Sequence, residues 1–250
     1  MPAEDDFALM TSLAYHPDLV PRFPLLPRHL ARLRTAHRTL AEQLPQCWCS
    51  RTTLYEDHDL VGELERAVAG AAERDGPKDL RVRMTILPTG RPRVETFPLQ
   101  SMPHYPVKLV FDDRPTTYND PFLTSKTTHR VKYDDARARR GATLSPSDEP
   151  DAAPFDVILW NPRGEITETS ISNVAFRFGG DASAEYVTPR RECGLLEGVQ
   201  RAELLERGEI DEGVVTVEEV KRAAADGSLE VICFNGVRGV FKAFVCLDPA

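Results

Sequence analysis

Apolar positions in the first eighty residues recur with the spacing of a short strand followed by two helices. Residues 7–15, FALMTSLAY, mix apolar and small polar side chains as a strand does. Residues 28–44 place apolar side chains at spacings of three and four, which share one face of a helix. The side chains predicted on that face are Leu30, Leu33, His37 and Leu40. A second helix is predicted over residues 59–76, because Gly76 and Pro77 form a common stop signal.

The next stretch, residues 79–99, changes to an alternation of polar and apolar positions. The alternation is interrupted by Pro88, Thr89 and Gly90, which predicts a β-hairpin with its turn at these residues. Residues 105–113 predict one more strand. We therefore expect residues 1–113 to form a small N-terminal α+β domain.

The second half predicts a larger C-terminal α/β domain over residues 120–250, joined to the first by a linker at 114–119. Short strands are interleaved with helices there. The predicted elements are two strands in 155–180, a helix over 198–210, and two strands in 228–248 joined near Gly236. Residues 141–154 are rich in Pro, Ser, Asp and Ala, which is typical of a surface insertion.

Composition narrows the classes of partner. The chain has 250 residues, 41% hydrophobic and 28% charged, as globular proteins do. Its formal net charge of −8 argues against a general affinity for nucleic acid or anionic membranes. The N-terminal residues are acidic where a signal peptide is basic, and no apolar run approaches the roughly 18 residues of a membrane span. We expect a cytoplasmic protein with no nucleic-acid or membrane partner.

The five cysteines are scattered, and an odd number does not suggest a disulfide framework. Cys47 and Cys49 lie one residue apart, but no second Cys or His pair follows at the spacing of a zinc site. No metal site is expected.

Several residues offer the parts of a pyridoxal phosphate site, although each alone is also typical of a solvated surface position. Such a site needs a lysine for a Schiff base, a carboxylate that keeps the pyridine nitrogen protonated, and donors for the phosphate. Lys126 is the candidate lysine, and Glu165 or Glu168 the candidate carboxylate. Gly194 and Gly198 lead into a predicted helix, whose first N–H groups suit a dianion.

Four blocks of sequence carry a resemblance to a known family. They are DPFLTSKTTHRVKYDDARA, FDVILWNPRGEITETSISNVAF, TPRRECGLLEGVQRAELLERGEIDE and CFNGVRGVFKAFV. In this order and spacing they resemble the class IV, fold-type IV pyridoxal phosphate enzymes. Within that group the chain looks most like the aminodeoxychorismate lyase domain that some bacteria fuse to aminodeoxychorismate synthase. The resemblance implies two α/β domains, as in D-amino acid aminotransferase, with the cofactor at their interface.

The resemblance implies roles at the cofactor ring. Lys126 would form the Schiff base with pyridoxal 5'-phosphate and act as the catalytic acid and base. Glu168 would pair with the pyridine nitrogen, and Glu165 would be a turn residue.

It also implies the residues around the phosphate. Arg32, in the HLARL motif, would hold the phosphate together with the backbone amides of Val199, Gln200 and Val237. Asn173 would shape the floor of the pocket or serve as a structural turn asparagine.

The sequence departs from the family where the substrate is expected. Ser125 stands where the family often has histidine, and Asn235-Gly236 where it often has Asn-Ser. A Glu-Thr pair of the family is replaced by Thr11-Ser12. The candidate substrate-binding residues are Thr11, Ser12, Arg130 and Arg238, with Arg81 and Arg83 also open for a substrate carboxylate.

Three functions remain open. The first is cleavage of 4-amino-4-deoxychorismate to 4-aminobenzoate and pyruvate, a step toward folate. The second is transamination of an amino acid or amine, and the third is a non-catalytic relative that serves as a binding module. The resemblance also implies a homodimer and a functional link to aminodeoxychorismate synthase.

Overall fold

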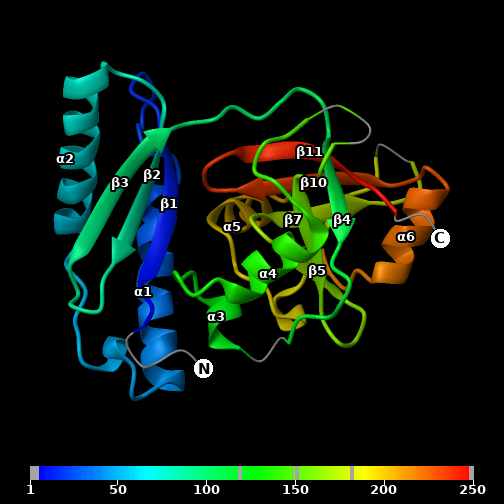
Figure 1. Ribbon diagram of the computed structural model, residues 1–250, viewed down its shortest axis with the longest axis horizontal. Coiled ribbons are helices and arrows are strands. Elements are labelled where there is room, and N and C mark those ends of the chain that lie inside the picture. Colours follow the sequence, from blue (N-terminus) through cyan, green and yellow to red (C-terminus); the bar gives the residue numbers. More distant parts are fainter. Residues whose placement is uncertain (1–5, 118–119, 148, 150–151, 181–182, 248–250) are drawn as a thin grey trace. The chain divides into compact units, whose positions relative to one another are not determined.

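The computed structural model of the chain describes residues 6–117, 120–147, 149, 152–180 and 183–247. The backbone forms two compact units (Figure 1). The first unit holds the described residues up to Ser101 together with Thr124–Arg130. The second holds Met102–Leu123 and the described residues from Val131 onward. Both units mix helices with sheet, which confirms the predicted fold class.

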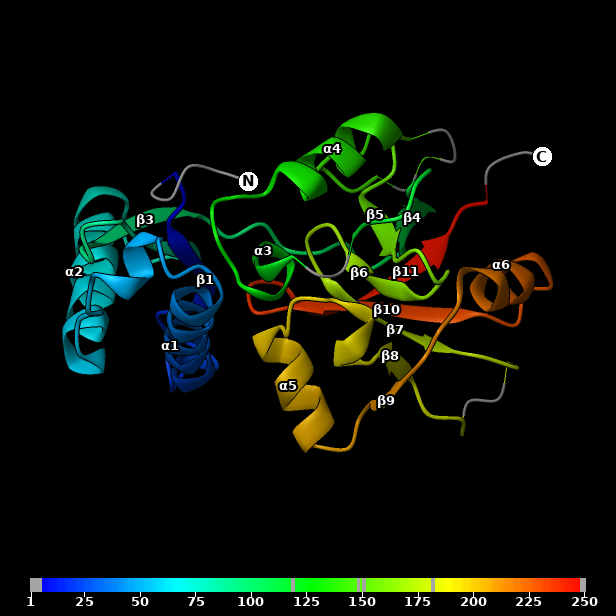
Figure 2. The ribbon, with the colours of Figure 1, turned by 90° about the horizontal axis from the view of Figure 1, so that it is seen from below.

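The first unit is built on an antiparallel sheet with the strand order β1-β2-β3. The strands are β1 (Leu9–Tyr15), β2 (Leu80–Ile86) and β3 (Pro92–Pro98). The helices are α1 (Leu26–Gln43), α2 (Asp57–Asp75) and the short 3₁₀ helix η1 (Trp48–Ser50). Helix α1 packs on β1, and α2 packs on β2 and β3, along the same face of the sheet (Figure 2). The predicted strand, helices and hairpin of this region are confirmed.

Alternation along β1 decides which side chains meet helix α1. Leu9 and Leu13 are fully buried, and Thr11 lies between them at the strand period of two. Thr11 therefore shares their face, where it contacts side chains of α1. Ser12 and its cross-strand partner Arg83 lie on the opposite face.

The second unit is built on a curled sheet whose strands, among the described residues, run in the order β6-β5-β4-β11-β10-β7-β8-β9. The strands are β4 (Val107–Phe111), β5 (Asp156–Trp160), β6 (Ile166–Thr169), β7 (Asn173–Arg177), β8 (Val187–Pro189), β9 (Asp211–Gly213), β10 (Glu230–Asn235) and β11 (Gly239–Val245). The helices are α3 (Pro121–Thr124), α4 (Val131–Arg140), η2 (Arg191–Cys193), α5 (Val199–Glu206) and α6 (Val217–Ala225).

Helices α4 and α5 pack on the face of this sheet that lies opposite its main hydrophobic cluster. Tyr133 of α4 packs against Val157 of β5, and Leu204 of α5 packs against Phe234 of β10. The main cluster takes the intervening strand residues, such as Ile158, because successive side chains point to opposite faces. This arrangement brings the start of α5 to Asn173 at the start of β7, where part of the candidate site lies.

The structure differs from the sequence prediction at the domain boundary. Strand β4 belongs to the second sheet, whereas the predicted boundary lies beyond it at residue 113. Thr124–Arg130 belong to the first unit, because their backbone pairs with β1. Residues 118 and 119 of the predicted linker, and 148, 150 and 151 of the predicted insertion, lie outside the described residues.

Helix α6 was missed by the sequence prediction. It begins with a capping box in which Glu219 N–H donates to Thr216 Oγ1 at 3.2 Å and Thr216 N–H donates to Glu219 Oε2 at 2.8 Å. Within the described ranges, no helix of the fold combines the length and the apolar character needed to cross a membrane.

Candidate active site

Lys126 lies in a short extended segment whose backbone is fixed against β1. Met10 N–H donates to the Lys126 carbonyl at 2.9 Å, and Thr128 N–H donates to the Ala8 carbonyl at 2.9 Å. Ser125 and Thr127, on either side of Lys126, are buried. Lys126 itself is half-buried, and its charge lies close enough to His29 to lower the pKa of that histidine. The lysine is thus placed by sheet hydrogen bonds and not by a helix.

Arg32 and His29 lie three residues apart on α1 and share one helical face near Lys126. Arg32 Nη2 donates to Thr11 Oγ1 at 3.0 Å, and the same oxygen lies 2.7 Å from His29 Nδ1. Burial lowers the pKa of His29 well below its ordinary value, and the positive charges of Arg32 and Lys126 lower it further. Burial also lowers the pKa of Arg32 to about 10. The histidine is therefore neutral and Arg32 remains charged at neutral pH.

Arg32 is half-buried, and its buried Nε is a donor without a partner in the part of the chain that the structure describes. Among the described residues, no hydrogen-bond partner reaches Arg32 Nε or His29 Nε2. A buried cation without an anionic partner is costly, and a phosphate is the kind of anion that a planar guanidinium holds with two parallel bonds. The surroundings of Arg32 therefore fit the phosphate role that the sequence predicts.

Glu168 occupies a buried position on β6 in the second unit. Its Oε1 accepts hydrogen bonds from Tyr133 Oη at 2.8 Å and from Leu196 N–H at 3.1 Å. Both bonds go to the same oxygen, and together they fix the orientation of the carboxyl group.

Glu165 has a different environment, although it lies only three residues away. Its Oε2 accepts from Arg163 Nε at 2.9 Å and from Asn161 Nδ2 at 2.8 Å. These bonds, the one from Arg163 first, lower the pKa of Glu165 to about 2. Glu165 thus closes the turn between β5 and β6, whereas Glu168 is bonded to Tyr133 and to the Leu196 backbone.

Asn173 connects Glu168 to the start of helix α5. Its Nδ2 donates to the Leu196 carbonyl at 2.8 Å, and its Oδ1 accepts from Gly198 N–H at 3.1 Å. The Leu196 peptide is therefore held by Glu168 through its N–H and by Asn173 through its carbonyl. A Cβ built on Gly198 would overlap Asn173 Oδ1, so this close approach requires glycine.

The first turn of α5 presents backbone donors. Gly198 is the N-cap, and the amides of Val199 and Gln200 follow it. The first N–H groups of a helix have no partner within the helix, and in the described part of the chain no other acceptor takes these two. With the positive end of the helix dipole, they fit a phosphate dianion.

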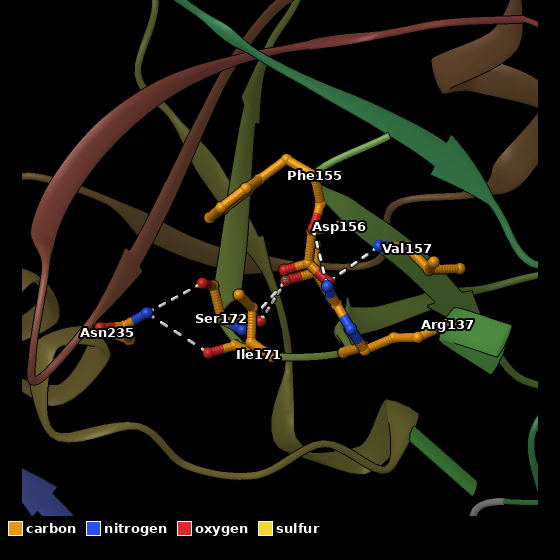
Figure 3. A network of polar contacts seen from close by, with 9 residues as sticks. Arg137, Phe155, Asp156, Val157, Ile171, Ser172 and Asn235 are labelled. Atoms are coloured by element: carbon orange, nitrogen blue, oxygen red, sulfur yellow. Dashed lines mark hydrogen bonds and ion pairs between the residues drawn. The ribbon is translucent and has the colours of Figure 1, made fainter. Parts of the chain in front are cut away.

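The amide of Val237 has a different partner from the one predicted. It donates to Asn235 Oδ1 at 3.0 Å, as does the amide of Arg238 at 2.9 Å. Asn235 Nδ2 in turn donates to Ser172 Oγ at 3.1 Å and to the Ile171 carbonyl at 3.3 Å (Figure 3). A phosphate would have to compete with Asn235 for the Val237 amide, so this donor is less available than those of α5.

The loop after β6 is braced from within by a buried carboxylate. Asp156 accepts from its own neighbour Val157 N–H at 2.8 Å and from Arg137 Nη1 at 3.2 Å, as Figure 3 shows. Thr169 Oγ1 donates to Asp156 Oδ2 at 2.6 Å, and Ser172 N–H donates to Thr169 Oγ1 at 3.1 Å. The strand end that carries Glu168 is thereby held in place by side chains behind the site.

The predicted substrate residues are divided between the two units. Thr11 contacts α1, whereas Ser12 lies on the other face of β1 beside Arg83. Arg130 precedes α4, which begins at Val131, so Arg130 and Lys126 do not share a helix. The guanidinium of Arg238 lies 5.5 Å from the centre of the Phe155 ring, within its own unit. The guanidiniums of Arg81 and Arg83 lie over the Phe97 ring at 4.4 and 5.4 Å.

The sequence reasoning missed two residues that touch the predicted site residues. His29 contacts Thr11, and its spacing of three from Arg32 was a usable signal. Tyr133 contacts Glu168 across 35 positions of sequence, and no local pattern could have indicated that contact.

The chain is similar to proteins of known family. A family model described as amino-transferase class IV matches residues 12–243. A Schizosaccharomyces pombe protein named as a candidate aminodeoxychorismate lyase is 29% identical over 229 residues, which cover 90% of this chain and 85% of that protein.

Solved structures of similar fold include two with aminotransferase names. One is a candidate amino-acid aminotransferase from Mesorhizobium loti, with a TM-score of 0.75 at 25% identity, covering 96% of this chain and 100% of that chain. The other is a fold IV transaminase from Curtobacterium pusillum, with a TM-score of 0.70 at 18% identity, covering 97% of this chain and 79% of that chain. These similarities confirm the predicted fold-type IV architecture.

Proposed function

Because the chain belongs to the class IV aminotransferase family, we propose that it binds pyridoxal 5'-phosphate through Lys126 and acts as a 4-amino-4-deoxychorismate lyase. The family depends on this cofactor. The observation that carries the lyase proposal is the similarity to the fission yeast protein, which extends along 90% of this chain. The products would be 4-aminobenzoate and pyruvate.

In this proposal Arg32 and the amides of Val199 and Gln200 would hold the phosphate, and Glu168 would face the ring nitrogen. Each of these groups is supported by its own local environment, described above. When bound, the cofactor supplies an electron sink for the carbon next to the substrate nitrogen. Glu168 supports this role because its fixed carboxylate keeps a proton on the ring nitrogen.

Lys126 moves the protons of the reaction. Its Nζ takes the proton from the ring carbon that carries the substrate amine, and it returns a proton to the enolpyruvyl group as that group leaves. Loss of that group makes the product ring aromatic, which drives the reaction without an amino acceptor. Positioned acid–base groups typically contribute about 10²–10⁴-fold, so Lys126→Ala is expected to lose at least that much turnover.

A class IV aminotransferase is the second candidate. It is supported by the Mesorhizobium loti structure, which carries an aminotransferase name and matches at 25% identity. Lys126 would take the same first proton in both reactions but would deliver it to the cofactor in a transaminase. The same residues serve either reaction.

Further parts of the proposal concern assembly and pathway. We propose a cytoplasmic homodimer that works in folate biosynthesis. Its functional partner there would be an aminodeoxychorismate synthase. Light scattering on the purified protein measures the assembly, and a monomer at micromolar concentration would contradict it.

The first experiment is reduction of the cofactor-loaded protein with borohydride, followed by peptide mapping. A covalent adduct on Lys126 is expected in the wild type and in Glu168→Gln, and none in Lys126→Ala or Lys126→Arg, since arginine cannot form an imine. No adduct in the wild type, or no binding of pyridoxal phosphate, would contradict the cofactor proposal and favour a non-catalytic binding module.

The second experiment separates the two reactions. Release of 4-aminobenzoate from 4-amino-4-deoxychorismate without an amino acceptor is expected of the lyase. Stable conversion of the bound cofactor to its pyridoxamine form by an amino donor alone, with no 4-aminobenzoate, would establish the transaminase instead.

A further inference from the structure

One hydroxyl oxygen joins Thr11, His29 and Arg32 in the first unit. Thr11 Oγ1 lies 3.0 Å from Arg32 Nη2 and 2.7 Å from His29 Nδ1. Thr11 is 1% exposed and His29 is fully buried. The three residues come from the middle of β1 and the first half of α1, so the sheet and the helix fix them together.

The protons in this contact can be assigned from the chemistry of the groups. A guanidinium can only donate, so Thr11 Oγ1 accepts from Arg32. We assign the single hydroxyl proton of Thr11 to its contact with His29 Nδ1 at 2.7 Å. With this assignment His29 is the neutral tautomer whose proton is on Nε2. Its burial beside Arg32 and Lys126 keeps it neutral.

We propose that Thr11 and His29 are positioning residues that fix the plane of the Arg32 guanidinium for the phosphate of the cofactor. Thr11 holds one end of the guanidinium fork, and His29 holds the Thr11 hydroxyl so that its lone pair faces Arg32. A planar fork with one end fixed has its remaining N–H directions fixed as well. The inference rests on the proposed function, in which Arg32 binds the phosphate.

The same geometry argues against a direct substrate role for Thr11. Its oxygen is hydrogen-bonded to both Arg32 and His29. Its side chain is buried on the face of β1 that meets α1. A substrate carboxylate, which needs a donor, would have to take the Thr11 proton from His29. The residue therefore acts through Arg32.

The test compares two ligands that differ only in the phosphate, pyridoxal phosphate and pyridoxal. Equilibrium dissociation constants are measured by absorbance for the wild type, Thr11→Val, Thr11→Ser, His29→Asn and Arg32→Lys. Valine matches threonine in shape but lacks the hydroxyl, whereas serine retains it. Asparagine can keep an acceptor near the place of His29 Nδ1. Circular dichroism and a thermal melt establish that each variant is folded.

Thr11→Val is expected to weaken pyridoxal phosphate about tenfold, the effect of one hydrogen bond to a charged group, with pyridoxal unchanged. Thr11→Ser and His29→Asn are expected to stay within about threefold of the wild type for both ligands. Equal weakening of both ligands by Thr11→Val, or no weakening at all, would overturn the inference.

Arg32→Lys separates this inference from the proposed function. Arg32→Lys is informative if it weakens the binding of pyridoxal phosphate alone while Thr11→Val weakens the binding of neither ligand. In that case the positioning role of Thr11 and His29 fails, and the phosphate role of Arg32 stands. If Arg32→Lys changes the dissociation constants of both ligands by the same factor, the proposed phosphate site itself fails.

A second measurement needs no ligand and remains informative if Thr11→Val does not fold. Nitrogen-15 spectra of the imidazole rings, assigned by comparison with His29→Asn, report which ring nitrogen carries the proton. A neutral ring protonated on Nε2 is expected in the wild type. A proton on Nδ1, or on both nitrogens at neutral pH, would contradict the assigned hydrogen-bond directions and with them the positioning role of Thr11 and His29.

Discussion

Replacing Gly198 by alanine tests the link between β7 and the start of α5. The backbone of Gly198, with φ −69° and ψ 146°, is one that alanine adopts freely. The conflict comes from the new Cβ, which would overlap Asn173 Oδ1. That oxygen is the acceptor for Gly198 N–H, so the side chain of Asn173 must turn away and release its contacts.

The size of the effect follows from those contacts. Asn173 would lose its bond from Gly198 N–H at 3.1 Å and its bond to the Leu196 carbonyl at 2.8 Å. A buried polar group left without a partner costs about 1–3 kcal/mol. Water at the loop satisfies part of this, so we expect the free energy of unfolding to fall by about 2–4 kcal/mol.

Urea unfolding followed by circular dichroism measures the change, and Gly62→Ala is the matched control. In α2 a Cβ at Gly62 meets only the flexible end of Arg66, at 3.6 Å. That substitution should therefore stabilise the helix by about 0.5–1 kcal/mol.

The decisive arm of the experiment is a double-mutant cycle with Asn173→Ala. Removing the Asn173 side chain removes the overlap, so Gly198→Ala should cost less than about 1 kcal/mol in that background. A full cost of 2–4 kcal/mol that persists without the Asn173 side chain would refute the reasoning, as would an unchanged stability of Gly198→Ala alone.

Three further outcomes are expected. Glu165→Gln removes a carboxylate whose pKa is lowered from 4.5 to about 2, chiefly by Arg163; its stabilisation is present above pH 4.5 and lost toward pH 2. Urea titrations should show the variant less stable at pH 6 and equal to the wild type near pH 2, and a constant difference would contradict this. Tyr133→Phe removes the donor to Glu168 Oε1 and should weaken pyridoxal phosphate about five- to tenfold, whereas unchanged affinity and absorbance would exclude the contact as functional. Cys246 is the one cysteine of the five that is not buried, so iodoacetamide followed by mass spectrometry should label it first; earlier labelling of another cysteine would contradict the packing.

Sequence patterns predicted those parts of the fold that depend on neighbours along the chain. The apolar spacing of α1 and the hairpin turn at Gly90 are local features, and both are present. Helix α6 also had a local signal, the Thr216 and Glu219 of its capping box, which the sequence reading overlooked. The position of β4 had none, because only its partners β5 and β11 assign it to the second sheet.

In the candidate site, too, some features have a local sequence signal and others depend on contacts between distant residues. Lys126, Arg32 and Glu168 were predicted through a family pattern, and the structure adds the neighbours that contact Arg32 and Glu168. The contact of Tyr133 with Glu168 depends on the packing of α4 against the sheet, which spacing alone does not determine. Val237 shows the reverse: the pattern assigned its amide to phosphate, but the geometry directs that amide to Asn235.

The path of the chain through Thr124–Arg130 limits how recombination can exchange the two units. The polypeptide passes from one unit to the other after Ser101, after Leu123 and again after Arg130. A gene broken once at Ser101 would leave Ala8 and Met10 without the backbone partners that Thr128 and Lys126 provide. Neither unit is a contiguous cassette, so recombination at a single breakpoint cannot exchange one of them whole. An exchange of the chain on only one side of Ser101 would therefore separate Lys126 from its own β1, the strand to which its backbone is hydrogen-bonded.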